Sequence, residues 1–168
     1  WLGLEWDEFY RQTDRLAIYK TYIQKLLDND KAFWCYHTHE ELEAESKAQM
    51  TAKEAPRHIC EYKNNADKAK DDRQGIIRLA VDTNSKRKIR FKDLIRGELE
   101  FDERLLGDFS VAKSVDEPLF HLAVVVDDYD TTISHVIRAE EHLANTPKHI
   151  LIQEALGFPQ PIYAHIPM

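Results

Sequence analysis

The sequence contains little cysteine and no long apolar run. Its 168 residues include only two cysteines, Cys35 and Cys60. This count excludes a disulfide-rich scaffold and makes a reducing, cytoplasmic location the expectation. No segment approaches the roughly 20 apolar residues that a membrane-spanning helix needs, so we expect no membrane partner. The opening WLGLEWDE lacks the basic and apolar regions of a signal peptide, so we expect none.

Several common signatures of nucleotide binding and hydrolysis are also missing. The sequence has no Walker-type glycine-rich loop and no GxGxxG fingerprint. It has no GxSxG nucleophile elbow either. Serine, histidine and aspartate are present, but no spacing among them indicates a catalytic triad. We therefore assign no catalytic residue from motifs.

The composition is that of a soluble globular protein with an uneven distribution of charge. Hydrophobic residues make up 43% and charged residues 32% of a chain whose length suits about one domain. The net charge of −7 argues against nucleic-acid binding over the whole surface. Residues 63–92, however, contain ten Lys or Arg against four Asp. This basic stretch is either a phosphate-contacting surface or a solvated hairpin.

The spacing of apolar residues predicts three helices, the first within residues 1–34. The expected N-caps are Thr13-Asp14, Thr38 and Thr146, and the expected ends are Asn29, Ala52 and Gly157. Thr38 is followed three residues later by Glu41, which is the pattern of a capping box. Pro147 at the first helical position supports a helix that begins there.

Short apolar runs predict strands over much of the remaining chain. The expected strands are 33–36, 76–81, 89–91, 109–112, 120–126, 133–137 and 162–166. A turn at 82–85 should join the second and third as a hairpin, and 120–126 has the character of a strand buried on both faces. Polar residues 64–74 indicate a loop or a short exposed helix. The last third is then an α/β unit, and the middle resembles an inserted α+β module.

Cysteine and histidine occur together in two short segments, with Cys35 and His37 in one and His58 and Cys60 in the other. Alternate residues of a strand point to the same side, so each segment offers two ligands. Two cysteines and two histidines form a closed tetrahedral site that suits Zn²⁺. The spacing differs from that of standard zinc fingers, so the alternative is two buried thiols beside surface histidines. His39 is a rival ligand, but the helix cap should turn it away.

Four segments of the chain carry a likeness to one known family. They are WLGLEWDE at 1–8, QTDR at 12–15 followed by Tyr19, IRG at 95–97, and LAVVVDDYDTTISHVIRAEEHLANTP at 122–147. Together they resemble bacterial glutamyl-tRNA synthetase, a class I aminoacyl-tRNA synthetase. The last run is the most specific, and the resemblance extends over essentially the whole chain.

The resemblance implies an α/β fold class: a partial class I Rossmann-type catalytic domain with an inserted α+β connective peptide. Residues 1–34 would end the first Rossmann half, 35–108 would form the connective module that binds the tRNA acceptor end, and 109–168 would belong to the second half. The His-Ile-Gly-His and Lys-Met-Ser-Lys-Ser motifs of the family would lie before and after these residues. We therefore expect an internal part of a longer protein, inactive alone.

The family joins glutamate to the 3′ end of tRNA(Glu) through a glutamyl-adenylate that is made from ATP with Mg²⁺. By resemblance, the glutamate-binding residues are Arg138, Phe120 and Val124, and the ATP-binding residues are Ala139, Glu141 and His142. Arg138 would pair with a carboxylate through its planar fork, with an ion pair to a neighbouring glutamate as the alternative. Phe120 stands where the family usually has Tyr, so the phenol oxygen is missing here.

The resemblance also assigns residues to tRNA and to zinc. The residues expected near the tRNA 3′ end are Arg96, Lys113 and Ser114, and the basic stretch 63–92 falls in the same module. Cys35 and His37 match a Cys-x-Cys zinc pair of some members, and His58 matches a tyrosine ligand. The last ligand of those members falls on Tyr62 here, so Cys60 would supply it from a shifted position. The expected Zn²⁺ is structural.

Two alternatives stay open beside a monomeric glutamate–tRNA ligase. A glutamyl-queuosine tRNA synthetase would transfer glutamate to a tRNA base, although the IRG and 122–147 segments are closer to the ligase. A non-catalytic tRNA- or zinc-binding module from a truncated gene would show no glutamate-dependent pyrophosphate exchange. In either case, we expect no glutamate-dependent pyrophosphate exchange from this chain by itself. The sequence does not choose between a tRNA(Glu)-specific ligase and one that also charges tRNA(Gln).

Overall fold

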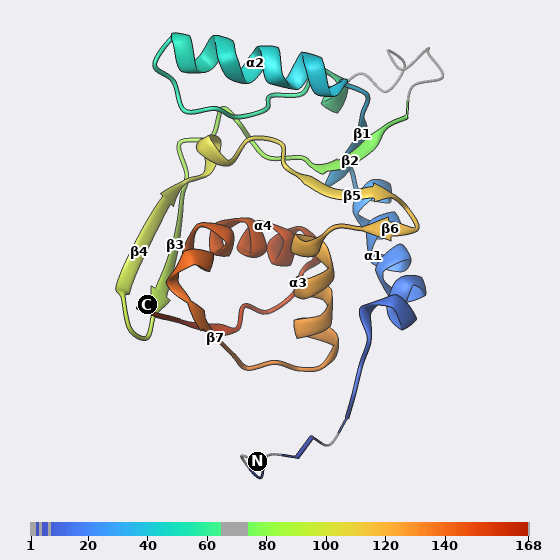
Figure 1. Cartoon of the computed structure of the whole chain (residues 1–168), viewed down its shortest axis with the longest axis vertical. Helices are drawn as coiled ribbons and strands as arrows, with labels where there is room; N and C mark the ends of the chain where they lie inside the picture. Colours follow the sequence, from blue (N-terminus) through green and yellow to red (C-terminus); the bar gives the residue numbers. More distant parts are fainter. Residues whose placement is uncertain (1–2, 4, 7, 65–73, 168) are drawn as a thin grey trace.

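Two four-stranded sheets organise the chain in the computed structural model, which describes residues 3, 5–6, 8–64 and 74–167 (Figure 1). The antiparallel first sheet has the order β1 (Ala32–Cys35), β2 (Ile76–Leu79), β5 (Ser110–Ser114) and β6 (Glu117–Pro118). The second sheet has the order β4 (Gly97–Asp102), β3 (Lys88–Asp93), β8 (Ile162–Ile166) and β7 (His135–Ala139). Strand β8 runs parallel to both of its neighbours, while β3 and β4 form an antiparallel hairpin.

Within the described ranges, four α-helices and four short 3₁₀ helices accompany the sheets. The α-helices are α1 (Leu16–Asp28), α2 (His39–Thr51), α3 (Phe120–Asp130) and α4 (Thr146–Leu156). The 3₁₀ helices are η1 (Gln12–Arg15), η2 (Glu61–Asn64), η4 (Glu103–Leu106) and η5 (Glu140–Asn145). Helices α3 and α4 lie in the middle of the molecule, with β5 and β6 on one side and β7 on the other, and α2 lies beyond the first sheet (Figure 1). None of the helices in the described part is long and apolar enough to cross a membrane.

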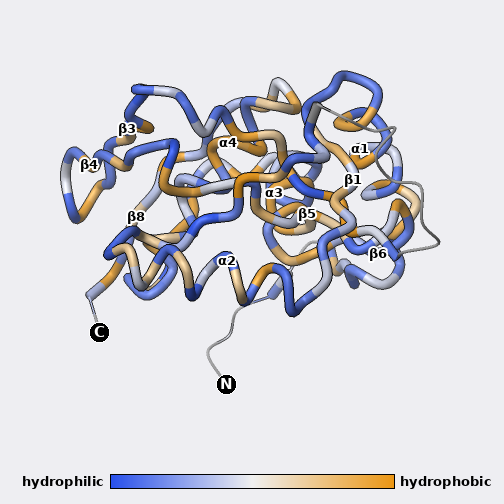
Figure 2. Tube along the Cα trace, turned by 90° about the horizontal axis from the view of Figure 1, so that it is seen from above, coloured by the Kyte–Doolittle hydropathy of each residue, from blue (hydrophilic) through white to orange (hydrophobic). Residues whose placement is uncertain are grey.

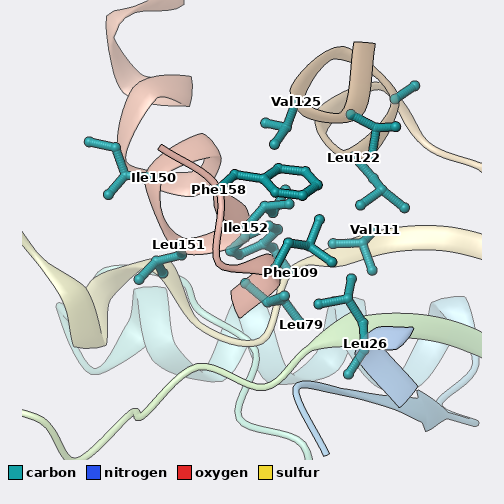
Figure 3. Packing of buried hydrophobic residues seen from close by; sticks show 14 of the residues in the cluster. Leu26, Leu79, Phe109, Val111, Leu122, Val125, Ile150, Leu151, Ile152 and Phe158 are labelled. Carbon is teal, nitrogen blue, oxygen red and sulfur yellow. The ribbon is translucent and has the colours of Figure 1, made fainter. Parts of the chain in front are cut away.

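The hydrophobic core forms where α3 and α4 meet α1, β2 and β5. The apolar parts of these elements come together in the centre of the molecule (Figure 2). Figure 3 shows Leu26, Leu79 and Val111 facing the side chains of the two central helices. Leu122 and Ile152 have no exposed surface. Truncating a side chain buried to this degree to alanine typically costs about 2–5 kcal/mol of stability.

Several local predictions are confirmed. Thr38 caps α2 in a full capping box, in which its hydroxyl accepts from the Glu41 amide and the Glu41 carboxylate accepts from the Thr38 amide. Asn29 ends α1. Gly157 ends α4 in the left-handed conformation, with φ of 75°. These features depend on residues close together in sequence, which is why local patterns predict them.

The prediction of a strand at 120–126 is wrong, because this segment forms helix α3. Its buried residues are Leu122, Ala123, Val125 and Val126. A short apolar run cannot be assigned to strand or helix from periodicity when nearly every position is apolar. The last third therefore has the order helix, strand, helix, strand. Asp127 accepts hydrogen bonds from Arg15 and Tyr19 and so joins α3 to α1.

The predicted hairpin of 76–81 with 89–91 is also wrong. Both strands form, but β2 belongs to the first sheet and β3 to the second. The turn between them exists, since Ser85 donates its amide to the Asp82 carbonyl at 3.1 Å. It leads the chain from one sheet to the other because β2 pairs with β1 and β5 instead. The pairing of β2 with β1 and with β5 therefore joins residues on both sides of the domain boundaries that we expected at 34 and 108.

Two helix starts differ from their predictions. Thr13 lies inside the 3₁₀ helix η1, and α1 follows with Arg15 at its N-cap, so only 12–28 of the first 34 residues are helical in the described part. Asn145 is the N-cap of α4, and the Thr146 hydroxyl bonds to tertiary partners instead of the helix amides. Most of the polar segment 64–74 lies outside the described residues.

Candidate functional site

Arg138 is the centre of a polar cluster at the carboxyl end of β7. Its Nε donates to His165 Nε2 at 3.0 Å, and its Nη2 donates to Thr146 Oγ1 at 2.8 Å. Its Nη1 lies 3.4 Å from His149 Nδ1, and its guanidinium lies over the Tyr163 ring. Burial lowers the pKa of Arg138, but a guanidinium stays charged in proteins. The carboxyl ends of parallel strands are where open α/β sheets bind ligands.

Arg138 forms no ion pair with a carboxylate in the described part of the chain, so the alternative with Glu140 or Glu141 is not seen there. Glu140 instead pairs with Arg96. A guanidinium has five N–H donors, and three of them are directed at neutral side chains of this chain. The remaining donors suit a carboxylate, which an arginine binds with two parallel hydrogen bonds.

His165 and Asp93 continue this cluster into the interior. Both side chains have no exposed surface, and His165 Nδ1 lies 2.6 Å from Asp93 Oδ2. The Asp93 carboxylate also accepts from the amides of Ile95 and Arg96, both at 2.9 Å. Burial would raise the pKa of Asp93, but these hydrogen bonds outweigh it and lower the pKa to about 2. Asp93 is therefore a carboxylate at neutral pH. Nothing in the sequence patterns identified either residue.

Two further histidines lie next to Arg138, and the sequence did not indicate them. His121 on α3 and His149 on α4 are 3.2 Å apart between Nδ1 and Nε2. Burial and nearby positive charges lower the pKa of His121 to about 4 and that of His149 to about 3. Both rings are thus neutral at pH 7 and do not repel Arg138.

Phe120, Val124 and Asp128 share one face of α3 because they are four residues apart on a helix. Phe120 is 55% exposed and its ring lies beside His121 and His149, which places it at the Arg138 cluster. Val124 packs at the edge of the core. Burial raises the pKa of Asp128 to about 6, and Arg138 opposes this rise. The helix keeps Phe120 and Val124 on one side, as the expected strand would also have done.

The residues expected near ATP follow Arg138 directly in the chain. Ala139 ends β7, and Glu141 and His142 lie in η5. His142 Nε2 lies 3.4 Å from a Glu141 oxygen, and its Nδ1 lies 3.3 Å from the Asn145 amide nitrogen. All three sit at the carboxyl end of a parallel strand, next to the Arg138 cluster.

The three residues expected near tRNA lie on two different sheets. Arg96 is in the turn between β3 and β4 and pairs with Glu140. Lys113 and Ser114 end β5 in the first sheet, where Lys113 Nζ pairs with Glu117 at 2.6 Å. In the basic stretch, four of the seven described cations have acidic partners, namely Lys63, Arg87, Lys88 and Arg90. Lys68, Lys70 and Arg73 lie outside the described residues.

The four expected metal ligands come together as a cluster. The ligand atoms of Cys35, His37, His58 and Cys60 all lie within 4.8 Å of one another. Cys35 Sγ is 3.4 Å from His37 Nδ1 and 3.6 Å from His58 Nε2, and Cys60 Sγ is 3.7 Å from His37 Nδ1. Sulfur and nitrogen ligands of tetrahedral zinc lie about 3.6 Å apart. The cluster therefore has the donors and the spacing to hold Zn²⁺.

Groups around the cluster support such a site. Glu45 Oε2 lies 2.6 Å from His58 Nδ1, which leaves Nε2 directed at Cys35 and follows the carboxylate–histidine–metal arrangement of zinc sites. Hydrogen bonds from Cys60 and the two histidines lower the pKa of the Cys35 thiol. Tyr62 packs its ring against His37 at 5.0 Å between ring centroids. His39 is exposed and pairs with Glu43. Cys60 thus lies in the cluster, at the shifted position from which we expected it to supply the fourth ligand.

The buried Asp108 holds the Cys60 segment against the sheet. Its carboxylate accepts from the amides of Cys60 and Val81 and from Lys63, all at 3.0 Å. Gly107 precedes it with φ of +61°, and a Cβ there would lie 2.8 Å from the backbone nitrogen and oxygen of His58. The cluster therefore depends on a close backbone approach that only glycine permits.

The parallel strands and the arginine at their carboxyl end define an α/β protein with a candidate site for a small anionic ligand. A family model described as tRNA synthetases class I (E and Q), catalytic domain, matches residues 1–168, so the chain belongs to this family.

Curated relatives and solved structures agree with this assignment. The chain is 44% identical to the glutamate–tRNA ligase of Desulforamulus reducens over 99% of its own length, and 44% identical to that of a Synechococcus strain over 100%. It spans 37% of the length of each relative. The crystal structure of the glutamate–tRNA synthetase from Elizabethkingia anophelis covers all of the chain with a TM-score of 0.85 at 28% identity. A second, of a glutamate–tRNA ligase from Elizabethkingia meningosepticum in complex with its amino acid, has a TM-score of 0.82.

Proposed function

We propose that this chain is part of a monomeric, cytoplasmic glutamate–tRNA ligase and supplies the carboxylate-binding arginine of its amino-acid site. The observation that carries the proposal is Arg138, a half-buried cation whose hydrogen bonds in the described part of the chain all go to neutral side chains. Asp128 attracts Arg138 without forming an ion pair with it. A half-buried charge that lacks an ion-pair partner is costly, and a bound carboxylate would pair with Arg138 directly. Phe120 and Val124 would line the aliphatic part of glutamate from α3.

The activation step requires ATP with Mg²⁺ next to the bound glutamate. We assign Ala139, Glu141 and His142 to the ATP side, because they continue from Arg138 at the same edge of the sheet. Positioning of the two substrates and stabilisation of charge are the main requirements for attack on a phosphate. These residues would serve positioning, and we assign none of them as a catalytic residue.

We assign residues 35–108 to an inserted module that receives the acceptor end of tRNA(Glu). Arg96, Lys113 and Ser114 would contact the 3′ end, with Arg96 exchanging Glu140 for a phosphate. The Cys35, His37, His58 and Cys60 cluster would hold a structural Zn²⁺ that joins the end of β1 to the loop before η2. A closed set of four ligands offers fold stability and no open coordination position for chemistry.

Glutamate binding to the purified chain tests the amino-acid site. Titration of glutamate should perturb the NMR signals of Arg138 and its neighbours, and Arg138→Ala should weaken binding about tenfold or more. Arg90→Ala is the matched control, because Arg90 is an exposed arginine paired with Glu100 on the same sheet. Equal binding by the Arg138 variant, or no binding by the parent chain, would contradict the proposal. Transfer of glutamate to a queuosine base by a longer protein that carries this chain would favour the second enzyme class.

A further inference from the structure

The Asp93 carboxylate connects the turn that carries Arg96 with the side chain of Arg138. One oxygen, Oδ1, accepts from the amides of Ile95 and Arg96, which fixes the turn between β3 and β4. The other, Oδ2, lies 2.6 Å from His165 Nδ1. The His165 amide also approaches both oxygens, at 3.2 and 3.1 Å. A single buried carboxylate at the end of β3 therefore accepts from the β3–β4 turn and from His165 on β8, which lies 72 residues after Asp93.

This contact determines which nitrogen of His165 carries the proton. Asp93 is ionised and can only accept, so His165 Nδ1 must donate. In a neutral imidazole the other nitrogen, Nε2, then has a free lone pair. Arg138 Nε donates to this lone pair at 3.0 Å. The same Nε2 lies 3.1 Å from the Thr146 hydroxyl, which also receives a hydrogen bond from Arg138 Nη2.

We propose that Asp93 and His165 are positioning residues that set the orientation of Arg138 for a substrate carboxylate. This inference rests on the proposed function of Arg138. By holding His165 in its Nδ1–H form, Asp93 gives Arg138 a fixed acceptor and leaves its outer donors free. Because the same carboxylate ties down the Arg96 turn, the expected tRNA-contacting turn and the carboxylate site form one rigid unit. Movement of the turn would therefore change the orientation of the Arg138 side chain.

The variant Asp93→Asn separates this role from a purely structural one. Its side chain has nearly the same shape, but its amide nitrogen can donate to His165 Nδ1. His165 then carries its proton on Nε2, which can no longer accept from Arg138. Long-range ¹H–¹⁵N NMR spectra of the chain should show His165 protonated on Nδ1 in the parent and on Nε2 in the variant. The Arg138 Nε–H signal should shift at the same time, and glutamate binding should weaken about tenfold.

Asp108→Asn is the matched control, because Asp108 is equally buried but belongs to the network beside Cys60. It should leave the His165 tautomer and the Arg138 signal unchanged. If Asp93→Asn retains the Nδ1–H tautomer and the parental Arg138 signal, the inference is wrong.

Should Asp93→Asn not fold, Thr146→Val and His165→Gln give a second comparison. We expect His165→Gln to shift the Arg138 Nε–H signal, and Thr146→Val to leave the His165 tautomer in place. The tautomer measurement needs no ligand, so a parent chain that binds no glutamate would refute the proposed function and leave this result intact.

Discussion

Gly107 shows how a single residue controls the Cys and His cluster. Its positive φ, and the 2.8 Å that would separate an added Cβ from the His58 backbone, leave no room for another side chain. Gly107→Ala should therefore lower the melting temperature and expand the cluster. Gly157→Ala provides the comparison, because φ there is +75° but nothing lies within 4 Å of the added methyl group. That variant should cost only about 1–2 kcal/mol for the left-handed backbone, as measured by urea unfolding. Equal losses in the two variants would show that the close approach does not matter.

The buried His149 should make stability depend on pH. Its pKa in the folded protein is about 3, well below the ordinary 6.5, because burial and neighbouring cations disfavour the charged ring. The unfolded chain therefore binds this proton more tightly. The free energy of unfolding should decrease as pH falls from about 6.5 towards 3, by up to about 1.4 kcal/mol per pH unit for this group.

The variant His149→Gln should flatten this part of the stability profile, measured by urea unfolding between pH 7 and 4. His39→Gln, on the exposed start of α2, controls for loss of an imidazole. The titration of Asp128 is common to all three proteins, whereas His121 is in contact with His149, so the difference between the profiles reports this histidine pair. Parallel profiles for parent and His149→Gln would contradict the assignment.

At the scale of elements, the Cys and His cluster depends on the segments that bring its four residues together. The purified chain should contain about one equivalent of zinc, and Cys60→Ser should lose it. Tyr62→Phe keeps the ring beside His37 but removes the hydroxyl, so it should retain the metal. Metal analysis by mass spectrometry decides whether Cys60 or Tyr62 supplies the fourth ligand. Zinc that survives in Cys60→Ser but is lost in Tyr62→Phe would make Tyr62 the ligand.

Helix α2 covers the cluster and supplies Glu45, so its cap should matter for the site as well as for the helix. Thr38→Ala removes the capping box and should cost about 1 kcal/mol of stability. Thr51→Ala, at the other end of the same helix, removes only a hydroxyl that donates to the Lys47 carbonyl. It should be nearly neutral. Thermal unfolding of the zinc-loaded chain measures the loss of stability in both variants. Equal losses would show that the capping box does not stabilise the helix.

How far the sequence predicts these elements depends on the range of the interactions. The Thr38 box and the Gly157 cap involve neighbours in the chain, and the sequence predicts them correctly. The grouping of Cys35, His37, His58 and Cys60 was also predicted, because the two pairs alternate along short segments. Helix α3 was mistaken for a strand because its apolar run lacks a clear period. The Asp93–His165 contact could not be predicted, since it depends on the parallel register of β3 and β8.

At the scale of the whole molecule, the second sheet leaves one face of β7 and β8 uncovered in the described part. The exposed fractions of Ile137, Ile162 and Ile166 are 64%, 45% and 46%. Parallel strands are ordinarily covered on both faces. The chain should therefore bind a hydrophobic dye such as anilinonaphthalene sulfonate, and Ile137→Thr should reduce the fluorescence. Ile59→Thr, at a residue that is 48% exposed outside this sheet, should change it little. A similar decrease in both variants would contradict this prediction.

The position of β8 between β3 and β7 has a consequence for biosynthesis. Asp93, at the end of β3, leaves the ribosome 72 residues before His165, its partner on β8. At ordinary rates of translation this delay is roughly 4 to 14 seconds. During that interval the Asp93 carboxylate has no histidine to bind and β3 has no neighbour on the side that β8 later occupies. The second sheet can therefore be completed only after β8 has been made, although its β3–β4 hairpin can form earlier.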